Sequence, residues 1–579
     1  MGRLKRYVWR YRWRYLVGGL CLLGTATLVM WIPWWIREAV RAIENGGPLG
    51  EVAYYCLLIG VAAVAQGIVR TYSRALIFNA GRNVEYDLRN DVFAHLQKLP
   101  RSFYHSQQTG DLMSRVINDI SAVRVMLGPG ILNIVNAPLY YVYALALMLS
   151  MDARMTLAAM LPFALLMFAA RRFRGGIMQS SLEVQRQMSV LSSHVQENLS
   201  GMHVVKTFTQ EDFQIREFIR LNEEFQAKSM ELAKMRGIVS PVMQGVNGLT
   251  VLIVIWYGGI RVVHGDLLVA DIVAFIAYLN TLAWPTAAFG WMLSLLERGR
   301  AAVKRLDEIL EREPEIADPP NPAPVPALEQ GIEFRNVSFA YGGQTNGHAA
   351  LDGVSFSLPV GRTVGLVGRI GSGKSTVAQL VPRLFDVSAG QILMDGRDIR
   401  TLSLSELRKN LGYVPQDPFL FSTSLRRNLL FGRDDLSHEA LPDAVTIAKL
   451  DRDVEIFPGG LDTLVGERGV TLSGGQKQRA TLARALLMDP PVLILDDCLS
   501  SVDAQTEAEI LQGLKSILRE KTCLIISHRI SAVKSADEIL VLDEGQILER
   551  GNHEQLIRHG GIYAELYQQQ QLTEELEQI

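Results

Sequence analysis

The stretch Gly368-Arg-Ile-Gly-Ser-Gly-Lys-Ser375 stands between an apolar run, Val364–Val367, and a helix-favouring run, Thr376–Leu384. It fits the pattern G-x-x-x-x-G-K-[ST], in which glycines let backbone N–H groups surround a phosphate at the start of a helix. The strand and helix expected on either side disfavour the alternative, a glycine-rich turn without a ligand. The pattern therefore predicts a nucleotide site in which Lys374 reaches the β- and γ-phosphates and Ser375 ligates Mg²⁺. The expected phosphate-holding residues are Gly368, Gly371, Ser372, Gly373, Lys374, Ser375 and Thr376.

Two stretches downstream carry groups suited to the same ligand. Val492-Leu-Ile-Leu-Asp496 is predicted to be a buried strand that ends in a carboxylate. An acid at the carboxyl end of a strand beside a phosphate loop holds Mg²⁺ directly or through water. Leu472-Ser-Gly-Gly-Gln476 opens a helix-favouring run and offers N–H donors to an anion. Each stretch is commonplace by itself, and its meaning comes from the phosphate loop beside it.

The first half of the chain predicts a membrane domain. Of 579 residues, 48% are hydrophobic and 20% are charged, which excludes a disordered chain. Apolar runs suited to helices through about 30 Å of hydrocarbon cover residues 15–36, 52–69, 131–151, 155–170, 241–260 and 272–296. The first run is too long for a signal peptide, and tryptophans occupy the place of small cleavage-site residues. Six basic residues and no acid within residues 1–14 predict a cytoplasmic N-terminus.

The spacing of these runs predicts the domain organisation. The connections between the second and third runs and between the fourth and fifth runs are long, and both are expected on the cytoplasmic side, as helices that extend beyond the bilayer. Residues 1–312 are therefore predicted to form an all-α domain of six spans. Six prolines from Pro314 to Pro326 mark residues 313–327 as a stiff, extended linker. Residues 328–579 alternate short β-branched runs with helical stretches, which predicts an α/β P-loop domain. Their glutamine- and glutamate-rich tail, 563–579, favours a helix that is solvated or packs against a partner.

The phosphate loop, the LSGGQ segment and the acid-ended strand, in this order and spacing, resemble the nucleotide-binding domain of ATP-binding-cassette transporters. Six spans followed by one cassette resemble the half-transporters of the multidrug-exporter type, and the resemblance covers essentially the whole chain. It implies an ATP-hydrolysing transporter that uses ATP and Mg²⁺. It also implies coupling helices within Leu99–Leu112 and Glu197–Glu211, which press on the cassettes.

The resemblance assigns roles to single residues. Tyr341 matches the aromatic side chain that stacks on adenine, Gln416 the glutamine that contacts Mg²⁺ and the coupling segments, and His528 the histidine that contacts the γ-phosphate. Val465–Gly469 matches a segment that touches the partner's transmembrane helices, and Ser500–Asp503 matches the loop between two cassettes. The signature that closes on the ATP of a second cassette corresponds to Ser473, Gly474, Gly475 and Gln476.

The sequence departs from the family at Asp497. Most active cassettes place Glu directly after the metal-binding Asp, as the general base, whereas Asp497 is one methylene shorter. A misplacement of about 1 Å can cost on the order of 100-fold in rate. We therefore expect a degenerate site, with an intact signature that serves the ATP of a second half-transporter. Its catalytic residues are expected to be Asp497, His528 and Gln416, and its metal ligands Ser375, Gln416 and Asp496.

The leading interpretation is one subunit of a heterodimeric exporter of hydrophobic or amphiphilic compounds. It is expected to be multi-pass in a bacterial inner membrane, with the N-terminus and the cassette in the cytoplasm. A homodimeric slow exporter or lipid flippase is an alternative within the same fold. A regulatory ATP-binding subunit, such as a gated pore, is an alternative of another class, and the intact His528, Gln416 and LSGGQ weigh against it. The spans exclude a nucleic-acid partner, and the four scattered cysteines fit a reducing compartment.

Polar residues within the spans are candidates for contact with the transported molecule. They are Gln66, Asn133, Asn136, Tyr140, Tyr143, Gln244, Asn247, Tyr278, Asn280 and Trp284. The lining of a cavity explains them as well as the alternative does, which is hydrogen bonding between helices together with aromatic belts at the membrane interfaces. Because no span is dense in charge, an amphiphilic substrate is favoured over a strongly ionic one.

Overall fold

The computed structural model describes residues 2–341, 349–431, 433, 440–466 and 472–577. Within these ranges, it leaves the side chains of 105, 163–174, 239, 240, 243, 287, 289 and 573–577 undescribed. The chain divides into two compact units, the first made of residues 1–95 and 110–311 and the second of residues 96–109 and 312–579. The second unit thus includes a short piece of chain from the first half of the sequence.

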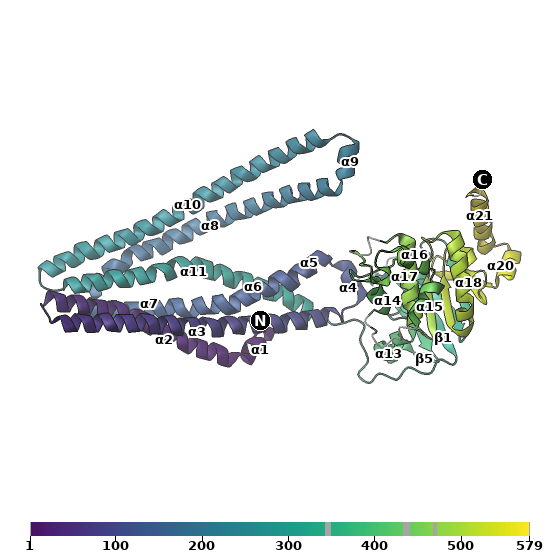
Figure 1. Cartoon of the computed structure of the whole chain (residues 1–579), viewed down its shortest axis with the longest axis horizontal. Coiled ribbons are helices and arrows are strands. Elements are labelled where there is room, and N and C mark those ends of the chain that lie inside the picture. The colour runs from purple at the N-terminus through teal and green to yellow at the C-terminus, as the bar shows by residue number, and fades with distance from the viewer. Residues whose placement is uncertain (1, 342–348, 432, 434–439, 467–471, 578–579) are drawn as a thin grey trace. The chain divides into compact units, whose positions relative to one another are not determined.

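The first unit is helical (Figure 1). Its helices are α1 (Gly2–Arg10), α2 (Arg12–Glu44), α3 (Leu49–Leu96), α5 (Thr109–Ser114), α6 (Ile120–Val125), α7 (Ile131–Met151), α8 (Ala153–Ser200), α9 (Met202–Thr207), α10 (Glu211–Val263) and α11 (Val269–Leu310), with π-helical turns η1 (Arg115–Asp119) and η2 (Met126–Gly130). The 48 residues of α3 extend over about 72 Å at 1.5 Å per residue, far more than a bilayer core needs. The prediction of an all-α domain with long extended helices is confirmed.

Five helical stretches among the described residues are long and apolar enough to cross a membrane. They are Arg12–Glu44, Leu49–Leu96, Thr109–Met151, Gln244–Val263 and Val269–Leu310. The remaining expected span, 155–170, lies at the start of α8, where part of the side chains is not described. The number of six spans therefore stays a prediction.

Helices α2 and α11 are joined by polar contacts and by a shared buried cluster that contains Met30 of α2 and Phe275 of α11. The hydroxyl of Tyr278 donates to the carbonyl oxygen of Met30 over 3.1 Å, and both residues are fully buried. Nearer the ends of these helices, Arg37 Nε donates to the buried carboxylate of Asp271 over 2.5 Å. In this unit, polar side chains thus connect neighbouring helices.

The pair α8 and α10 forms an extension of the first unit. The two helices run side by side and α9 joins them (Figure 1). None of the residues of α9 is buried, and Met202, Val204 and the following Phe208 are exposed. The second predicted coupling segment, Glu197–Glu211, contains α9.

The second unit holds two sheets and short helices (Figure 1). A four-stranded antiparallel sheet has the order β2-β1-β4-β5, from β1 (Gly331–Phe339), β2 (Leu351–Pro359), β4 (Ala389–Met394) and β5 (Arg397–Asp398). A six-stranded sheet has the order β10-β9-β3-β8-β7-β6, from β3 (Thr363–Gly368), β6 (Leu411–Val414), β7 (Val492–Asp496), β8 (Thr522–Ile526), β9 (Glu538–Asp543) and β10 (Gln546–Gly551). All its pairs are parallel except that of β10 with β9. The predicted α/β P-loop architecture is confirmed.

Helices surround these sheets. They are α4 (Arg101–Ser106), α12 (Lys374–Leu380), α13 (Leu404–Lys409), α14 (Leu425–Leu430), α15 (Ala440–Ile447), α16 (Asp451–Ile456), α17 (Gly474–Leu487), α18 (Ala504–Glu520), α19 (Ile530–Val533), α20 (His553–His559) and α21 (Ile562–Glu577), with 3₁₀ turns η4 (Ile399–Thr401) and η5 (Gly460–Asp462). Every residue of β3, β7 and β8 is buried, as expected for parallel strands covered on both faces.

The register of the parallel strands brings three chain segments to one edge of the sheet. Asp496 pairs with Ile526 in β8, and Leu366 in β3 pairs with the same Ile526. The carboxyl ends of β3, β7 and β8 therefore lie level. The phosphate loop, Asp497 and His528 follow these ends directly.

The proline-rich segment 313–327 runs along the second unit. Ala323 N–H donates to the carbonyl oxygen of Thr401 over 2.9 Å, and the carboxylate of Asp318 accepts from Leu404 N–H over 2.7 Å. Ala323, Val325 and Leu328 pack against the core between the sheets. The helix α4 belongs to the same unit, because Ser102 bonds to Glu315 and Arg312 lies over the ring of Phe103.

The start of the C-terminal tail packs within its own cassette, whereas residues 568, 569, 571 and 572 further along the same helix are exposed, as expected for a solvated helix. Tyr563 is fully buried, and its hydroxyl lies 2.7 Å from His553 Nδ1. The carboxylate of Glu549 accepts from the N–H groups of Ile562 and Tyr563 at the start of α21. The composition of the tail predicted the helix, but the tertiary partner Glu549 and the buried ring of Tyr563 decide where its first turn lies.

Candidate functional site

The phosphate loop connects β3 to α12 with a backbone that requires glycine. Gly373 has φ +99°, and a Cβ there would lie 2.2 Å from the carbonyl oxygen of Ala350. A Cβ at Gly368 would lie 1.9 Å from the carbonyl oxygen of Leu542. Gly371 also has positive φ, and a Cβ on it would meet open space. The loop is therefore a backbone cradle at the N-terminus of α12, as the sequence pattern requires.

Lys374 points back into this cradle. Its Nζ donates to the carbonyl oxygens of Gly368 (2.9 Å) and Arg369 (2.7 Å), and it lies 3.4 Å from Ser372 Oγ. Burial lowers the pKa of Lys374, and the nearby carboxylates of Asp497 and Asp496 oppose that shift. An ammonium group held by carbonyl oxygens in the loop is well placed for exchange of those neutral acceptors for phosphate oxygens.

Asp496 ends β7 as an almost completely buried carboxylate, 1% exposed. Its Oδ1 accepts from Ser375 Oγ over 2.9 Å, and its Oδ2 accepts from Tyr413 OH over 3.4 Å. Burial raises the pKa of Asp496, and the charge of the adjacent Asp497 adds to the shift. A buried carboxylate whose protein donors are hydroxyl groups fits a hard divalent cation such as Mg²⁺. This ion takes oxygen ligands, which come from carboxylates, from substrate phosphates and from water.

Asp497 follows in a left-handed conformation, with φ +48°, that turns its side chain toward two other predicted site residues. Its N–H donates to the Ile526 carbonyl over 2.8 Å. His528 Nδ1 lies 2.7 Å from Asp497 Oδ1, and Gln416 Nε2 lies 3.5 Å from Oδ2. Burial alone would raise the pKa of Asp497, but the hydrogen bond and charge of His528 outweigh it and hold the pKa below its ordinary value.

These contacts bring the three predicted catalytic residues together. Because Asp497 is ionised, the ring N–H at Nδ1 of His528 donates to it, which leaves Nε2 as the ring atom able to meet a ligand. The carboxylate that would activate water is thus already engaged by His528 and approached by Gln416. Its reach is shorter by one methylene than that of the glutamate the family uses.

Tyr341 stands at the end of β1, beside the first turn of α12. Its hydroxyl lies 3.0 Å from Thr376 Oγ1, and its ring packs edge-on against Phe339 and Phe385. The side chain is 50% exposed, so one face of the ring is available for a ligand. Thr376 joins this aromatic group to the phosphate loop.

The signature segment opens α17. Ser473 Oγ accepts from Gln476 N–H and Gln476 Oε1 accepts from Ser473 N–H, a reciprocal capping box. Gln476 Nε2 also donates to Asp453 over 2.7 Å. Gly475 packs so closely that a Cβ would lie 2.9 Å from the Ser501 carbonyl, and Gly474 also faces Ser501. Of the segment Val465–Gly469, residues 467–469 lie outside the described part of the chain.

Comparison with known proteins identifies the family. Residues 15–286 match the family model of the ABC transporter transmembrane region, and residues 351–500 match the family model described as ABC transporter. A probable multidrug resistance ABC transporter ATP-binding/permease protein of Bacillus subtilis is 35% identical, with 98% of each chain covered. The chain belongs to the ABC transporters.

Other relatives of this ABC transporter extend the comparison. An ATP-dependent lipid A-core flippase of Desulfotalea psychrophila is 33% identical, with 89% of each chain covered. A bacterial Atm1-family ABC exporter solved with ATP bound has a TM-score of 0.78 at 27% identity, with 98% of each chain covered. The chain is thus an ATP-hydrolysing transporter of the exporter type, as the sequence motifs predicted.

Sequence reasoning missed three side chains that shape the candidate nucleotide site of this ABC transporter. Tyr413 contacts Asp496 directly. Gln478, 2% exposed, donates to Ser500 Oγ and accepts from Ser501 N–H, which fixes the loop after Asp497. Arg529 donates to the carbonyl oxygens of Ser500 and Val502 and pairs with Glu507. For Gln478, the one sequence signal is a polar residue on the buried face of α17.

In the first unit, three of the polar span residues line one small cavity between α7 and α11. They are Asn133, Asn136 and Trp284, together with Ala137, Pro285, Ala288 and Met292. Asn133 Nδ2 donates to the carbonyl oxygen of Pro129, one turn earlier in its own helix. Asn133 therefore bonds within its own helix and also lines the cavity, together with Asn136 and Trp284.

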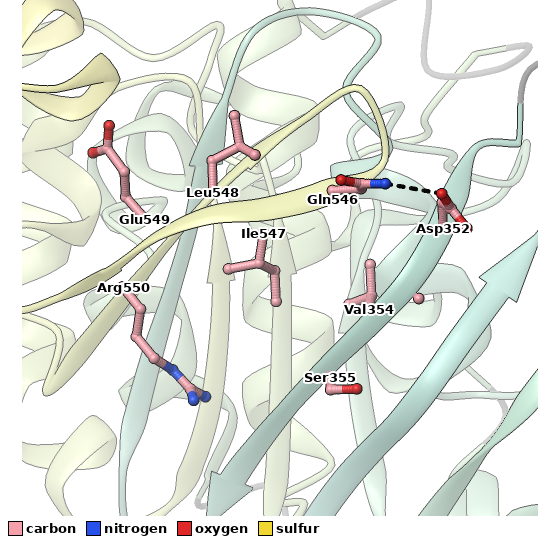
Figure 2. A pocket seen from close by; sticks show the side chains of 9 residues that line it. Asp352, Val354, Ser355, Gln546, Ile547, Leu548, Glu549 and Arg550 are labelled. Carbon is pink, nitrogen blue, oxygen red and sulfur yellow. Dashed lines mark hydrogen bonds between the residues drawn. The ribbon is translucent and has the colours of Figure 1, made fainter.

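A second hollow, in the cassette, is a groove between the edge strands β2 and β10 (Figure 2). Gln546 Nε2 donates to the carboxylate of Asp352 over 2.9 Å at one end, and Val354 and Ile547 line the floor. The groove lies on strands that do not carry the predicted nucleotide residues.

Proposed function

We propose that this chain is the degenerate-site subunit of a heterodimeric ABC exporter that moves hydrophobic or amphiphilic compounds out of the cytoplasm or the inner leaflet. The observation that carries the proposal is Asp497 in the position of the catalytic glutamate, beside an intact Ser473–Gln476 signature. The exporter would be multi-pass in a bacterial inner membrane, with N-terminus and cassette cytoplasmic. Domain limits of 1–312, 313–327 and 328–579 belong to the same proposal.

The residues around the phosphate loop have distinct tasks in this function. The loop N–H groups and Lys374 bind the phosphates, and the ring of Tyr341 supports the adenine. Ser375, Asp496 and Gln416 would hold Mg²⁺, which would neutralise part of the phosphate charge. His528 offers Nε2 to the terminal phosphate, while Asp497 orients its ring. The short reach of Asp497 and its bond to His528 favour tight binding and slow hydrolysis at this site.

The exposed surface of α9 supports a second chain. Met202, Val204 and Phe208 are apolar and exposed at the tip of a long helical pair. Apolar tips of this kind are typical of surfaces that another chain covers. A second half-transporter, which provides its own glutamate and cassette, is the partner that the family architecture supplies.

The first experiment is the native mass of the complex. The chain is tagged in its own host, extracted gently from the membrane and weighed. One 64.4 kDa chain together with a different chain of similar size is expected. Two identical chains would contradict the heterodimer, and a homodimeric exporter or lipid flippase would then be favoured, as the flippase relative suggests.

The second experiment extends the shortened carboxylate. In a complex whose partner carries an intact signature, Asp497→Glu is expected to raise ATP turnover at this chain's site by about 10- to 100-fold. Asp489→Glu, the same lengthening at an exposed aspartate, is the control and should leave turnover unchanged. Strong hydrolysis by the wild-type chain alone would contradict a degenerate site.

A further inference from the structure

The last helix of the chain makes a two-point hydrogen bond to the backbone around His528. Gln570 Nε2 donates to the His528 carbonyl oxygen over 2.5 Å. Gln570 Oε1 accepts from Ile530 N–H over 2.8 Å. One amide side chain therefore uses both its donor and its acceptor on the segment that follows β8, although it lies about forty residues further along the chain.

This segment needs a partner from outside. Ile530 is the first residue of α19, and the N–H groups in the first turn of a helix have no acceptor within the helix. α19 has only four residues, too few to hold its own position by helical hydrogen bonds. Gln570 supplies the missing acceptor and, through the same amide group, fixes the carbonyl of the histidine two residues earlier.

Gln570 is itself held on a fixed element. The start of α21 is capped by the carboxylate of Glu549, and Tyr563 anchors the first turn in the core. Further along, Lys534 lies over the ring of Tyr567. The helix is thus attached to the cassette before it reaches Gln570, so the amide is positioned from a rigid support.

We infer that Gln570 is a positioning residue for His528, which sets the backbone from which the imidazole reaches the terminal phosphate of ATP. Asp497 bonds to the ring of His528, and Gln570 bonds to its backbone carbonyl oxygen. The inference rests on the role proposed above for His528. It does not depend on whether the second chain of the complex is identical or different, because all the residues belong to one cassette.

Amide exchange in the intact complex tests the contact directly. In Gln570→Met, which keeps the size of the side chain and removes both hydrogen bonds, the peptide containing Ile530 is expected to exchange at least about 10-fold faster. Gln571→Met is the matched control, because Gln571 is exposed and donates to Tyr567 of its own helix, and exchange in this variant should equal that of the wild type. Unchanged exchange in Gln570→Met would overturn the inference.

Labelling with 8-azido-ATP tests the consequence at this chain's own site, whether or not the site hydrolyses ATP. The labelled chain is isolated by its tag under denaturing conditions, and protection by ATP is compared with protection by ADP. His528→Ala is expected to reduce the preference for ATP over ADP, and Gln570→Met to reduce it by about 3- to 10-fold. The double variant should be no worse than His528→Ala.

The outcomes separate this inference from the proposed function. A Gln570→Met effect that persists in full in the His528→Ala background would indicate a general structural role and overturn the inference. A normal preference in Gln570→Met beside a reduced one in His528→Ala would also overturn it. No change in His528→Ala would instead overturn the role of His528, whereas the native mass and the Asp497→Glu result test the degenerate site separately.

Discussion

Asp496 and Asp497 are adjacent in the chain, and their surroundings move their pKa values in opposite directions. Burial raises the pKa of Asp496, whose donors are hydroxyl groups, whereas the hydrogen bond from His528 lowers that of Asp497 in spite of burial. Pairs of carboxyl groups separated in this way usually divide two tasks between them. Here Asp496 suits a cation, and Asp497 stays an ionised acceptor.

The raised pKa of Asp496 leads to a prediction about stability. A carboxyl group with a folded-state pKa above its unfolded value destabilises the fold when ionised, and this cost disappears as the pH falls through the folded pKa. Asp496→Asn is therefore expected to raise the unfolding temperature at pH 7 in the absence of ligand, by about 2–4 °C for each kcal/mol gained. Thermal unfolding with ATP, with and without Mg²⁺, should also show that Mg²⁺ no longer adds stability.

The opposite sign holds for Asp497. Its lowered pKa contributes stability above the unfolded value near 3.8, and this contribution is lost as the pH falls through the folded pKa. His528→Leu removes the hydrogen bond and is expected to shift acid unfolding to higher pH. Acid titration of the variant against His559→Leu, a histidine at the exposed end of α20, measures the difference. Equal acid midpoints would contradict the pairing.

At the scale of elements, Arg529 connects the segment after β8 to the start of α18. It pairs with Glu507, a carboxylate that is 4% exposed, and donates to the carbonyls of Ser500 and Val502. Arg529→Met leaves Glu507 buried without a cation, which is expected to cost about 3 kcal/mol of unfolding free energy. In Arg529→Met with Glu507→Gln, most of this loss should return, as measured by denaturant unfolding. A double variant as unstable as the single one would contradict the ion pair.

Sequence analysis predicted best those elements whose conformation is determined by residues close together in the chain. The glycines of the phosphate loop, the helix start at Ser473–Gln476 and the apolar run of β7 are each determined within a few residues. Gln570 and Tyr413 were missed because their contacts join residues far apart in the sequence, and one glutamine in a glutamine-rich tail gives no signal by itself. The packing of the start of α21 against its own cassette was missed for the same reason, since Glu549 and the burial of Tyr563 determine it.

At the scale of the whole molecule, the proline-rich segment acts as an edge of the cassette. A fragment that begins at Leu328 lacks the Ala323–Thr401 and Asp318–Leu404 hydrogen bonds and the apolar side chains of Ala323 and Val325. It is expected to unfold about 5 °C or more below a fragment that begins at Arg312, as two lost hydrogen bonds and buried apolar area imply. Equal unfolding temperatures in scanning calorimetry would contradict this.

The two-part organisation of the molecule was predicted from the change in hydropathy and periodicity along the chain, because both are properties of long segments. The membership of residues 96–109 in the second unit had no such signal. Only the resemblance indicated that this stretch serves the cassette. Composition cannot show it, since a short amphipathic helix between two spans has the same residue types whether it docks or stays in solvent.

The interlacing of the chain has a consequence for engineering. Because residues 96–109 belong to the unit that otherwise begins at Arg312, a cassette exchanged between relatives by joining genes at the proline-rich segment would arrive without its own α4. Such a chimera would face a foreign helix, with a foreign partner for Glu315 and for Arg312. An exchange of this cassette between relatives therefore needs two inserts, one for residues 96–109 and one for the segment that begins at Arg312.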